Sequence, residues 1–231
     1  MKTSSAAITA IFFDLGGVLV RTTDLEPRRK WEQRFGMRDW ALQDLFFNSP
    51  VGQAAQIGRA TTADAWAHVA ATLGLSAEEL SQLQADFWRG DTFDESLLAL
   101  VRSLHVRYKT GLISNAMPDA RAMYASRLNG DLFDILVFSG EEGVKKPDPE
   151  IFRRALARLA VRPEESIFVD DMPENVVAAQ ALGMHGVHFT SSTDLRRALA
   201  QLTGFTESAG LAQPQERYTA ARRPEGDARS T

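Results

Sequence analysis

The sequence contains no cysteine among its 231 residues, and this absence removes several kinds of chemistry. Disulfides, thiolate nucleophiles and zinc–thiolate centres are all excluded. No apolar run approaches the roughly 20 residues that a membrane-spanning helix needs, so no membrane partner is expected. The segment from Met1 to Ser5 leads directly into a strand-like stretch broken by Asp14, which is too short and too acidic for a secretory signal. We therefore expect a cytoplasmic protein.

A strong charge of one sign is also lacking. The formal net charge is −4, and no block of Lys and Arg is long enough to follow a phosphodiester backbone. Nucleic acid is therefore not an expected partner. A small anionic substrate stays compatible with this composition, because a local cation can outweigh a weak global charge. The 44% hydrophobic and 24% charged residues are typical of a globular protein.

Short apolar segments alternate with helical patterns along most of the chain. Buried strands are predicted at residues 8–13, 108–113, 135–138, 167–169 and 186–189, with helices at 118–128, 149–159 and 175–182. Such alternation predicts an α/β fold, with a Rossmann-like parallel sheet, right-handed crossovers and helices on both faces.

The segment between the first two predicted strands is far longer than the usual α/β connection. Residues 24–93 show no convincing strand, but they carry helical patterns at 25–35, 39–47, 62–73 and 77–88. We expect an inserted helical cap at residues 21–94 and an α/β core formed by residues 1–20 and 95–205. After Phe205 the apolar pattern fades, which predicts a disordered tail over residues 206–231.

Polar residues follow three of the predicted strands. Asp14 comes after the first strand, Ser114 and Asn115 after the second, and Asp170 and Asp171 after the fourth. In parallel sheets, ligands bind beyond the carboxyl ends of the strands, so these side chains are predicted to converge. Taken alone, Asp14 fits a turn, Ser114 and Asn115 fit a helix cap, and the acidic pair fits a helix start. Adjacent carboxylates at the end of a buried strand nevertheless repel each other unless a cation is near.

Together these residue types meet the needs of phosphoryl transfer. A carboxylate such as Asp14 can serve as a nucleophile and form an acyl phosphate. Ser114 offers a hydroxyl and Asn115 an amide to phosphoryl oxygens, while Lys146 can neutralise negative charge. The pair at 170 and 171 supplies the hard oxygen ligands that Mg²⁺ prefers.

The four segments that carry these residues resemble the ordered motifs of the haloacid dehalogenase-like (HAD) hydrolase superfamily. They read FFDLGGV at 12–18, LISN at 112–115, GVKKPDP at 143–149 and FVDDMPEN at 168–175. The position of the insertion resembles the subclass with a helical cap. The nearest group includes sugar-phosphate phosphatases and the phosphatase domain of soluble epoxide hydrolase.

The resemblance implies a role for each matching residue. Asp14 would be the nucleophile and a metal ligand, Ser114 would bind phosphate, and Lys146 would be the stabilising cation. Asp171 and the carbonyl of Gly16 would complete the protein's share of a Mg²⁺ shell. Asp170 would hold a metal-bound water or Lys146. The implied protein is a Mg²⁺-dependent phosphatase of a small phosphorylated metabolite, such as a sugar phosphate, working through a phosphoaspartate.

One position departs from the family pattern. Phosphatases of this family usually carry an Asp two residues after the nucleophile as general acid, and this chain has Gly16 there. A substrate with a good leaving group, an acid supplied by the cap or solvent, and loss of activity each fit that departure. We favour an activated leaving group, such as an anomeric or acyl phosphate.

Other functions compatible with the fold are a dehalogenase, a phosphonatase and a catalytically silent binding protein. A dehalogenase needs no metal, so the acidic pair at 170 and 171 speaks against it. A phosphonatase resembles its family only with a Schiff-base lysine in the cap, where Lys30 is the sole lysine. The silent binding protein would keep the fold, with Gly16 marking the loss of turnover.

Overall fold

The computed structural model describes residues 6–128 and 130–206 and contains a five-stranded parallel sheet. The strand order is β5-β4-β1-β6-β7, with β1 at the centre. The strands are β1 (Ala10–Phe13), β4 (Lys109–Ser114), β5 (Ile135–Phe138), β6 (Ser166–Asp170) and β7 (His185–His188). All five strands predicted from the sequence are confirmed, and the α/β fold class with them.

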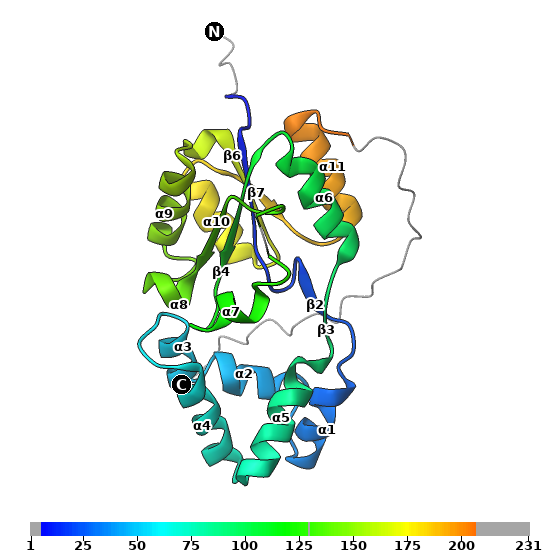
Figure 1. Ribbon diagram of the computed structural model, residues 1–231, viewed down its shortest axis with the longest axis vertical. Helices are drawn as coiled ribbons and strands as arrows, with labels where there is room; N and C mark the ends of the chain where they lie inside the picture. The colour runs from blue at the N-terminus through cyan, green and yellow to red at the C-terminus, as the bar shows by residue number, and fades with distance from the viewer. Residues whose placement is uncertain (1–5, 129, 207–231) are drawn as a thin grey trace, which may run out of the picture.

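Helices cover both faces of this sheet (Figure 1). One face packs against α6 (Glu95–His105) and α11 (Ser192–Thr203), the other against α9 (Pro149–Leu159) and α10 (Pro173–Ala181). Successive residues of β1 point to opposite faces. Ile11 and Phe13 therefore lie in the first hydrophobic cluster, and Ala10 and Phe12 lie in the second. Burial of β1 on both sides fixes Asp14, the next residue, in place.

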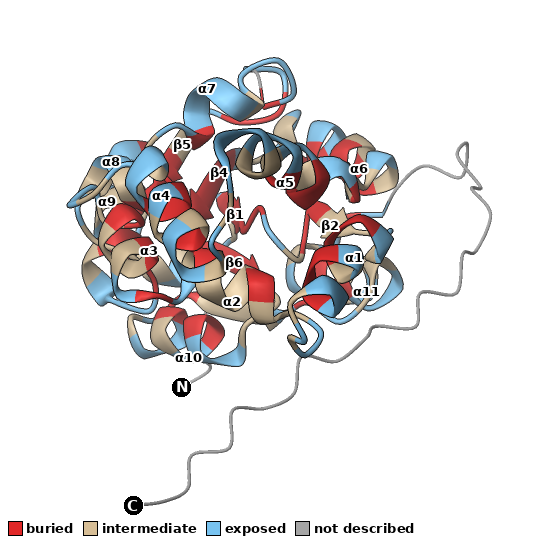
Figure 2. Cartoon of the chain, turned by 90° about the horizontal axis from the view of Figure 1, so that it is seen from below, coloured by how far each residue is buried: buried red, intermediate tan, exposed pale blue. Residues whose placement is uncertain are grey.

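The long connection after β1 is almost entirely helical. Its helices are α1 (Glu26–Arg34), α2 (Ala41–Phe47), α3 (Pro50–Ala55), α4 (Thr62–Leu73) and α5 (Ala77–Arg89). We call residues 26–89 the helical insertion. Its own hydrophobic cluster is rich in aromatic rings and includes one core residue, Met117. In Figure 2, seen from below, these helices surround the ends of β1, β4 and β6.

Two short strands connect the helical insertion to the core. β2 (Val20–Thr22) leads out of the core and β3 (Asp91–Phe93) leads back, and they pair antiparallel. The prediction of no strand between residues 24 and 93 was therefore wrong at β3. Three-residue strands whose partners lie about 70 positions apart leave no local pattern. None of the helices within the described residues is long and apolar enough to cross a membrane.

Smaller differences concern the remaining helices. The helix predicted at 118–128 is reduced to α7 (Ala120–Tyr124), and α3, α6, α11 and the short α8 (Ser139–Glu142) were not predicted. An additional 3₁₀ turn, η1 (Pro163–Glu165), precedes β6. The predicted tail lies outside the described residues from position 207 onward.

Candidate active site

Asp14 lies at the carboxyl end of the central strand. Its backbone N–H donates to the carbonyl of Val169 on β6 at 2.9 Å, which continues the sheet pairing to this residue. The side chain is buried, and its Oδ1 accepts a hydrogen bond from the Leu15 N–H at 2.7 Å. The same oxygen lies 2.8 Å from Lys146 Nζ. Asp14 is thus held rigidly beside a cation.

Lys146 bridges two carboxylates from neighbouring strands. Its side chain is almost fully buried, and Nζ lies 2.8 Å from Asp14 and 2.6 Å from Asp170. The Asn115 amide donates to the Lys146 carbonyl at 2.9 Å and accepts from the Lys146 N–H at 2.8 Å. Asn115 therefore fixes the backbone from which this cation extends, a role that sequence reasoning did not give it. Its predicted contact with substrate stays a prediction.

Asp170 is completely buried, and both of its oxygens accept hydrogen bonds. Oδ2 accepts from Lys146, while Oδ1 accepts from the Met172 N–H at 2.8 Å and from the Asn175 amide at 3.0 Å. These partners support the alternative in which Asp170 positions Lys146. Asn175 was missed as a site residue. Its place in the first turn of α10, five residues after Asp170, was the available signal, because that turn folds back over the strand end.

Asp171 approaches the turn that follows Asp14. A Cβ atom built on Gly17 would lie 2.2 Å from Asp171 Oδ2 and 2.4 Å from its Cγ, and Gly17 has φ +79°. Only glycine fits both the conformation and the contact. At Gly16 the same construction meets nothing within 4 Å. The turn therefore has no room for a side chain at position 17, where it faces Asp171, but has room for one at position 16.

Ser114 ends β4, the strand that pairs with β1. The side chain is buried, yet its hydroxyl makes no hydrogen bond to any other residue within 6–128 and 130–206. A hydroxyl left uncommitted at this edge is suited to donate to a ligand oxygen.

The electrostatics of the site favour a bound cation. Burial raises the pKa of Asp14 to about 8; Lys146 opposes this rise, and repulsion from Asp170 and Asp171 adds to it. Burial alone would lower the pKa of Lys146, but Asp14 and Asp170 raise it on balance. Carboxylate oxygens of Asp14, Asp170 and Asp171 lie within 4.8 Å of one another. This oxygen-only donor set fits Mg²⁺, which would keep Asp14 ionised.

The structure therefore brings Asp14, Lys146, Asp170 and Asp171 together, as the sequence predicted. Ser114 ends the adjoining strand β4, and Asn115 follows it. A parallel sheet with a carboxylate after its central strand, a buried lysine and an acidic pair defines an α/β protein with a cluster of ionisable side chains at the carboxyl edge of its sheet.

Comparison with known proteins identifies the family to which the chain belongs. The model of haloacid dehalogenase-like hydrolases matches residues 8–183. The chain belongs to this family and is a hydrolase. A sesquiterpene phosphatase of Aspergillus oryzae is 30% identical over 199 residues, which cover 84% of this chain and 96% of the relative. Validoxylamine A 7'-phosphate phosphatase of Streptomyces hygroscopicus is 27% identical, over 82% of this chain and 88% of the relative.

Solved structures show the same fold. A HAD family enzyme of Bacteroides thetaiotaomicron, in complex with magnesium and inorganic phosphate, superposes with a TM-score of 0.68 at 22% identity, covering 80% of this chain and 96% of that one. A predicted HAD-like hydrolase of Porphyromonas gingivalis gives a TM-score of 0.70 at 24% identity, with 87% and 100% coverage.

Proposed function

We propose that this chain is a Mg²⁺-dependent phosphatase of a small phosphorylated metabolite, with Asp14 as its nucleophile. The observation that carries the proposal is the buried cluster in which Lys146 contacts Asp14 and Asp170, with Asp171 beside them. Family relatives named as phosphatases support this reaction class, and a structural neighbour binds magnesium and phosphate. The named substrates of these relatives range from a sesquiterpene to glyceraldehyde 3-phosphate, so they do not select one metabolite.

The chemistry follows from the positions of the side chains. An Asp14 carboxylate oxygen attacks phosphorus in line, and the bond between phosphorus and the leaving oxygen breaks. Water then hydrolyses the phosphoaspartate, which releases inorganic phosphate and regenerates Asp14. Lys146 and the Ser114 hydroxyl bind phosphoryl oxygens during both steps. Mg²⁺, held by Asp14, Asp171 and the Gly16 carbonyl, would supply charge neutralisation at the phosphoryl group.

We assign the helical insertion the role of a cap over this edge. It joins the core through β2 and β3, and its helices surround the strand ends (Figure 2). The proposed cap spans residues 21–94, and the core spans 1–20 and 95–205. A closed cap would exclude bulk water from the phosphoaspartate and contact the leaving group.

A panel of phosphorylated metabolites, assayed with and without Mg²⁺, tests the reaction. We expect Mg²⁺-dependent phosphate release from at least one of them, and its loss in Asp14→Asn with the fold retained by circular dichroism. Wild-type turnover in Asp14→Asn would refute the nucleophile. Ligand-induced thermal stabilisation without turnover would instead indicate a binding protein.

We further propose that the leaving group is an activated one, because Gly16 supplies no general acid. The open space at Gly16 allows a direct test, since Gly16→Asp adds a carboxyl group and Gly16→Asn adds a matched amide. We expect wild type to prefer anomeric phosphates to primary alkyl phosphates. Gly16→Asp should raise turnover of alkyl phosphates by about tenfold or more, and Gly16→Asn should not. Comparable wild-type turnover of both substrate types would contradict the proposal.

A further inference from the structure

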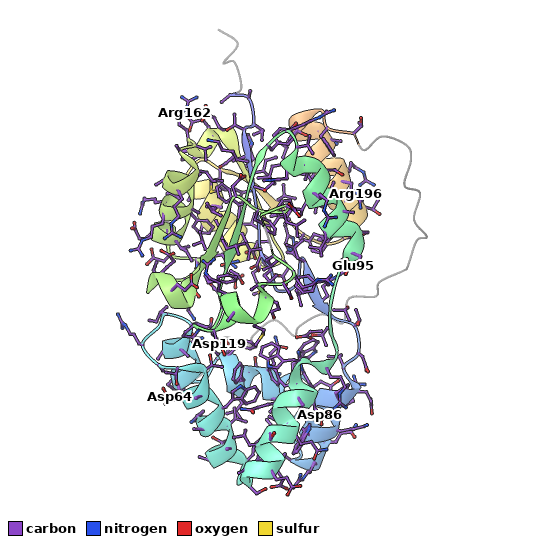
Figure 3. The ribbon with its side chains drawn as sticks, viewed as in Figure 1. Asp64, Asp86, Glu95, Asp119, Arg162 and Arg196 are labelled. Carbon is purple, nitrogen blue, oxygen red and sulfur yellow. The ribbon has the colours of Figure 1, made fainter. Side chains whose placement is uncertain are left out.

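The helical insertion contacts the core at a second place, away from the β2–β3 ribbon. Thr62 at the start of α4 donates a hydrogen bond to Asp119 of the core at 2.6 Å. A Cβ on Gly58 would lie 2.5 Å from the carbonyl oxygen of Gly140, so the two backbones touch there. Figure 3 shows Asp119 at the boundary between the core and the helical insertion. The insertion is thus closed onto the core in this structure.

Lys145, which precedes Lys146 in the chain, makes another polar contact across this boundary. Its ammonium donates to the side-chain carbonyl oxygens of Gln53 on α3 and of Gln56, the C-cap of that helix, the latter at 3.3 Å. Gln56 is buried and also donates to the Phe47 carbonyl at 2.6 Å. One lysine of the core therefore holds α3 and, through Gln56, the end of α2.

The partners of this ammonium are neutral. Lys145 is half-buried, and within the described ranges no carboxylate oxygen lies within 4.0 Å of its Nζ. Burial lowers the pKa of Lys145 accordingly. The two amide oxygens replace hydrogen bonds to water but carry no negative charge. Closure of the insertion over Lys145 therefore desolvates its ammonium without placing a carboxylate beside it.

Lys146, the next residue, supplies the charge of the site. Its ammonium contacts Asp14, where the proposed phosphoryl group would bind. A bound phosphate dianion would attract the Lys145 ammonium more strongly when that ammonium is desolvated than when it is hydrated. A ligand shifts a conformational equilibrium by the difference in its affinity for the two states, so phosphate would favour the closed state.

We propose that Lys145 is a positioning residue that couples closure of the helical insertion to occupation of the site by a phosphate group. The ammonium acts through Gln53 on α3 and Gln56 at the end of that helix, and it takes no part in bond breaking. This inference rests on the proposed phosphatase function for its ligand, but its test does not require turnover.

The absence of cysteine makes a distance measurement direct. Ala71→Cys on α4 and Ala157→Cys on α9 replace exposed alanines, and spin labels there report the separation of the insertion from the core. Distances are recorded with and without inorganic phosphate, in the presence of Mg²⁺. We expect phosphate to shorten and narrow the distribution in the otherwise wild-type chain, and the distribution to stay long and broad in Lys145→Met.

Lys109→Met is the matched control. Lys109 also donates to a neutral oxygen, the carbonyl of Leu159 at 2.6 Å, but it lies at the opposite end of β4. It should respond to phosphate as wild type does. An unchanged phosphate response in Lys145→Met, or a wild-type distance insensitive to phosphate, would overturn the proposal.

Kinetics separate positioning from a structural role. Lys145→Met should raise KM for a turned-over phosphate ester about tenfold with a smaller change in kcat, and Lys145→Arg should recover part of the loss. Equal loss in both variants, with closure intact, would contradict the inference. Absence of turnover in every variant would refute the phosphatase function while the distance measurement still decides the role of Lys145.

Discussion

Two buried cations lie in different regions of the molecule, and their partners differ. Lys146 stands at the carboxyl edge of the sheet, where it contacts Asp14 and Asp170. Arg28 stands in the helical insertion beside the β2–β3 ribbon, where its Nη2 donates to both carboxylate oxygens of Asp91 at 2.7 Å. Both side chains are at least nine-tenths buried. Burial and ion pairing alone therefore do not distinguish a functional site from an ion pair that only stabilises the fold.

The difference lies in what surrounds each ion pair. All three guanidinium nitrogens of Arg28 donate to fixed acceptors, which belong to Thr22, Gln43, Phe87 and Asp91. Such a planar fork leaves no donor for a ligand. Lys146 instead joins a carboxylate cluster that includes Asp14, and β4, the strand paired with β1, ends in Ser114, whose hydroxyl is uncommitted within the described residues. A candidate functional site is thus distinguished from a structural ion pair by a polar group, here the Ser114 hydroxyl, that makes no hydrogen bond within the described residues.

The catalytic edge should be the more sensitive region to small changes, and Gly17→Ala tests this most strongly. The added methyl overlaps the Asp171 carboxylate and must displace it. A displacement of about 1 Å at such a site can lower turnover by about 10²-fold. Phosphate release at saturating Mg²⁺, together with the Mg²⁺ concentration for half-maximal rate, measures the effect.

Gly74→Ala is the control for this change. Gly74 also has a positive φ, +66°, but an added Cβ there meets nothing within 4 Å. Both variants should lose about 1–2 kcal/mol of stability from backbone strain. Equal phosphate release by the two variants would show that the approach to Asp171 is unimportant.

Local sequence patterns predicted the sheet because each strand is a short apolar run that ends in turn residues. They missed the β2–β3 ribbon, since its pairing joins Val20 to Phe93 across the whole insertion. The omission of α6 has a different cause. Its buried Leu97, Leu100, Val101 and Leu104 have helical spacing, so the signal was present in the sequence but lay against the expected domain boundary.

The site could be predicted as far as residue types and strand ends allow. Asp14, Asp170 and Asp171 converge because β1 and β6 are parallel neighbours, and Lys146 reaches them from the loop that precedes α9. The contact of Asn115 with the Lys146 backbone was not predicted because it depends on loop conformation. The contact of Asn175 with Asp170 was missed although the position of Asn175 in the first turn of α10 was an available signal. Nor could it predict the neutral partners of Lys145, which come from another part of the fold.

Asn175→Ala should have a smaller effect than the change at Gly17. It removes one donor from Asp170 while the Met172 N–H and Lys146 remain. We expect about tenfold slower phosphate release, in the range found when partners of metal-site residues are removed. Asn48→Ala removes a comparable Asn–Asp hydrogen bond at an exposed position of the insertion and should have no such effect. Equal rates for the two variants would argue against a role for Asp170 in orienting Lys146.

The smallest effect on turnover is expected from Arg28→Met, despite the largest loss of contacts. The variant leaves Asp91 without its guanidinium partner, which should lower the free energy of unfolding by about 3 kcal/mol, as measured by urea denaturation. Arg34→Met breaks an exposed pair with Glu79, which solvent screens, and should lower the free energy of unfolding much less. Because Arg28 donates only to protein acceptors, the folded fraction of Arg28→Met should release phosphate at a rate near that of wild type. A large fall in kcat with unchanged stability would instead place Arg28 in the chemistry and erase the distinction between the two cations.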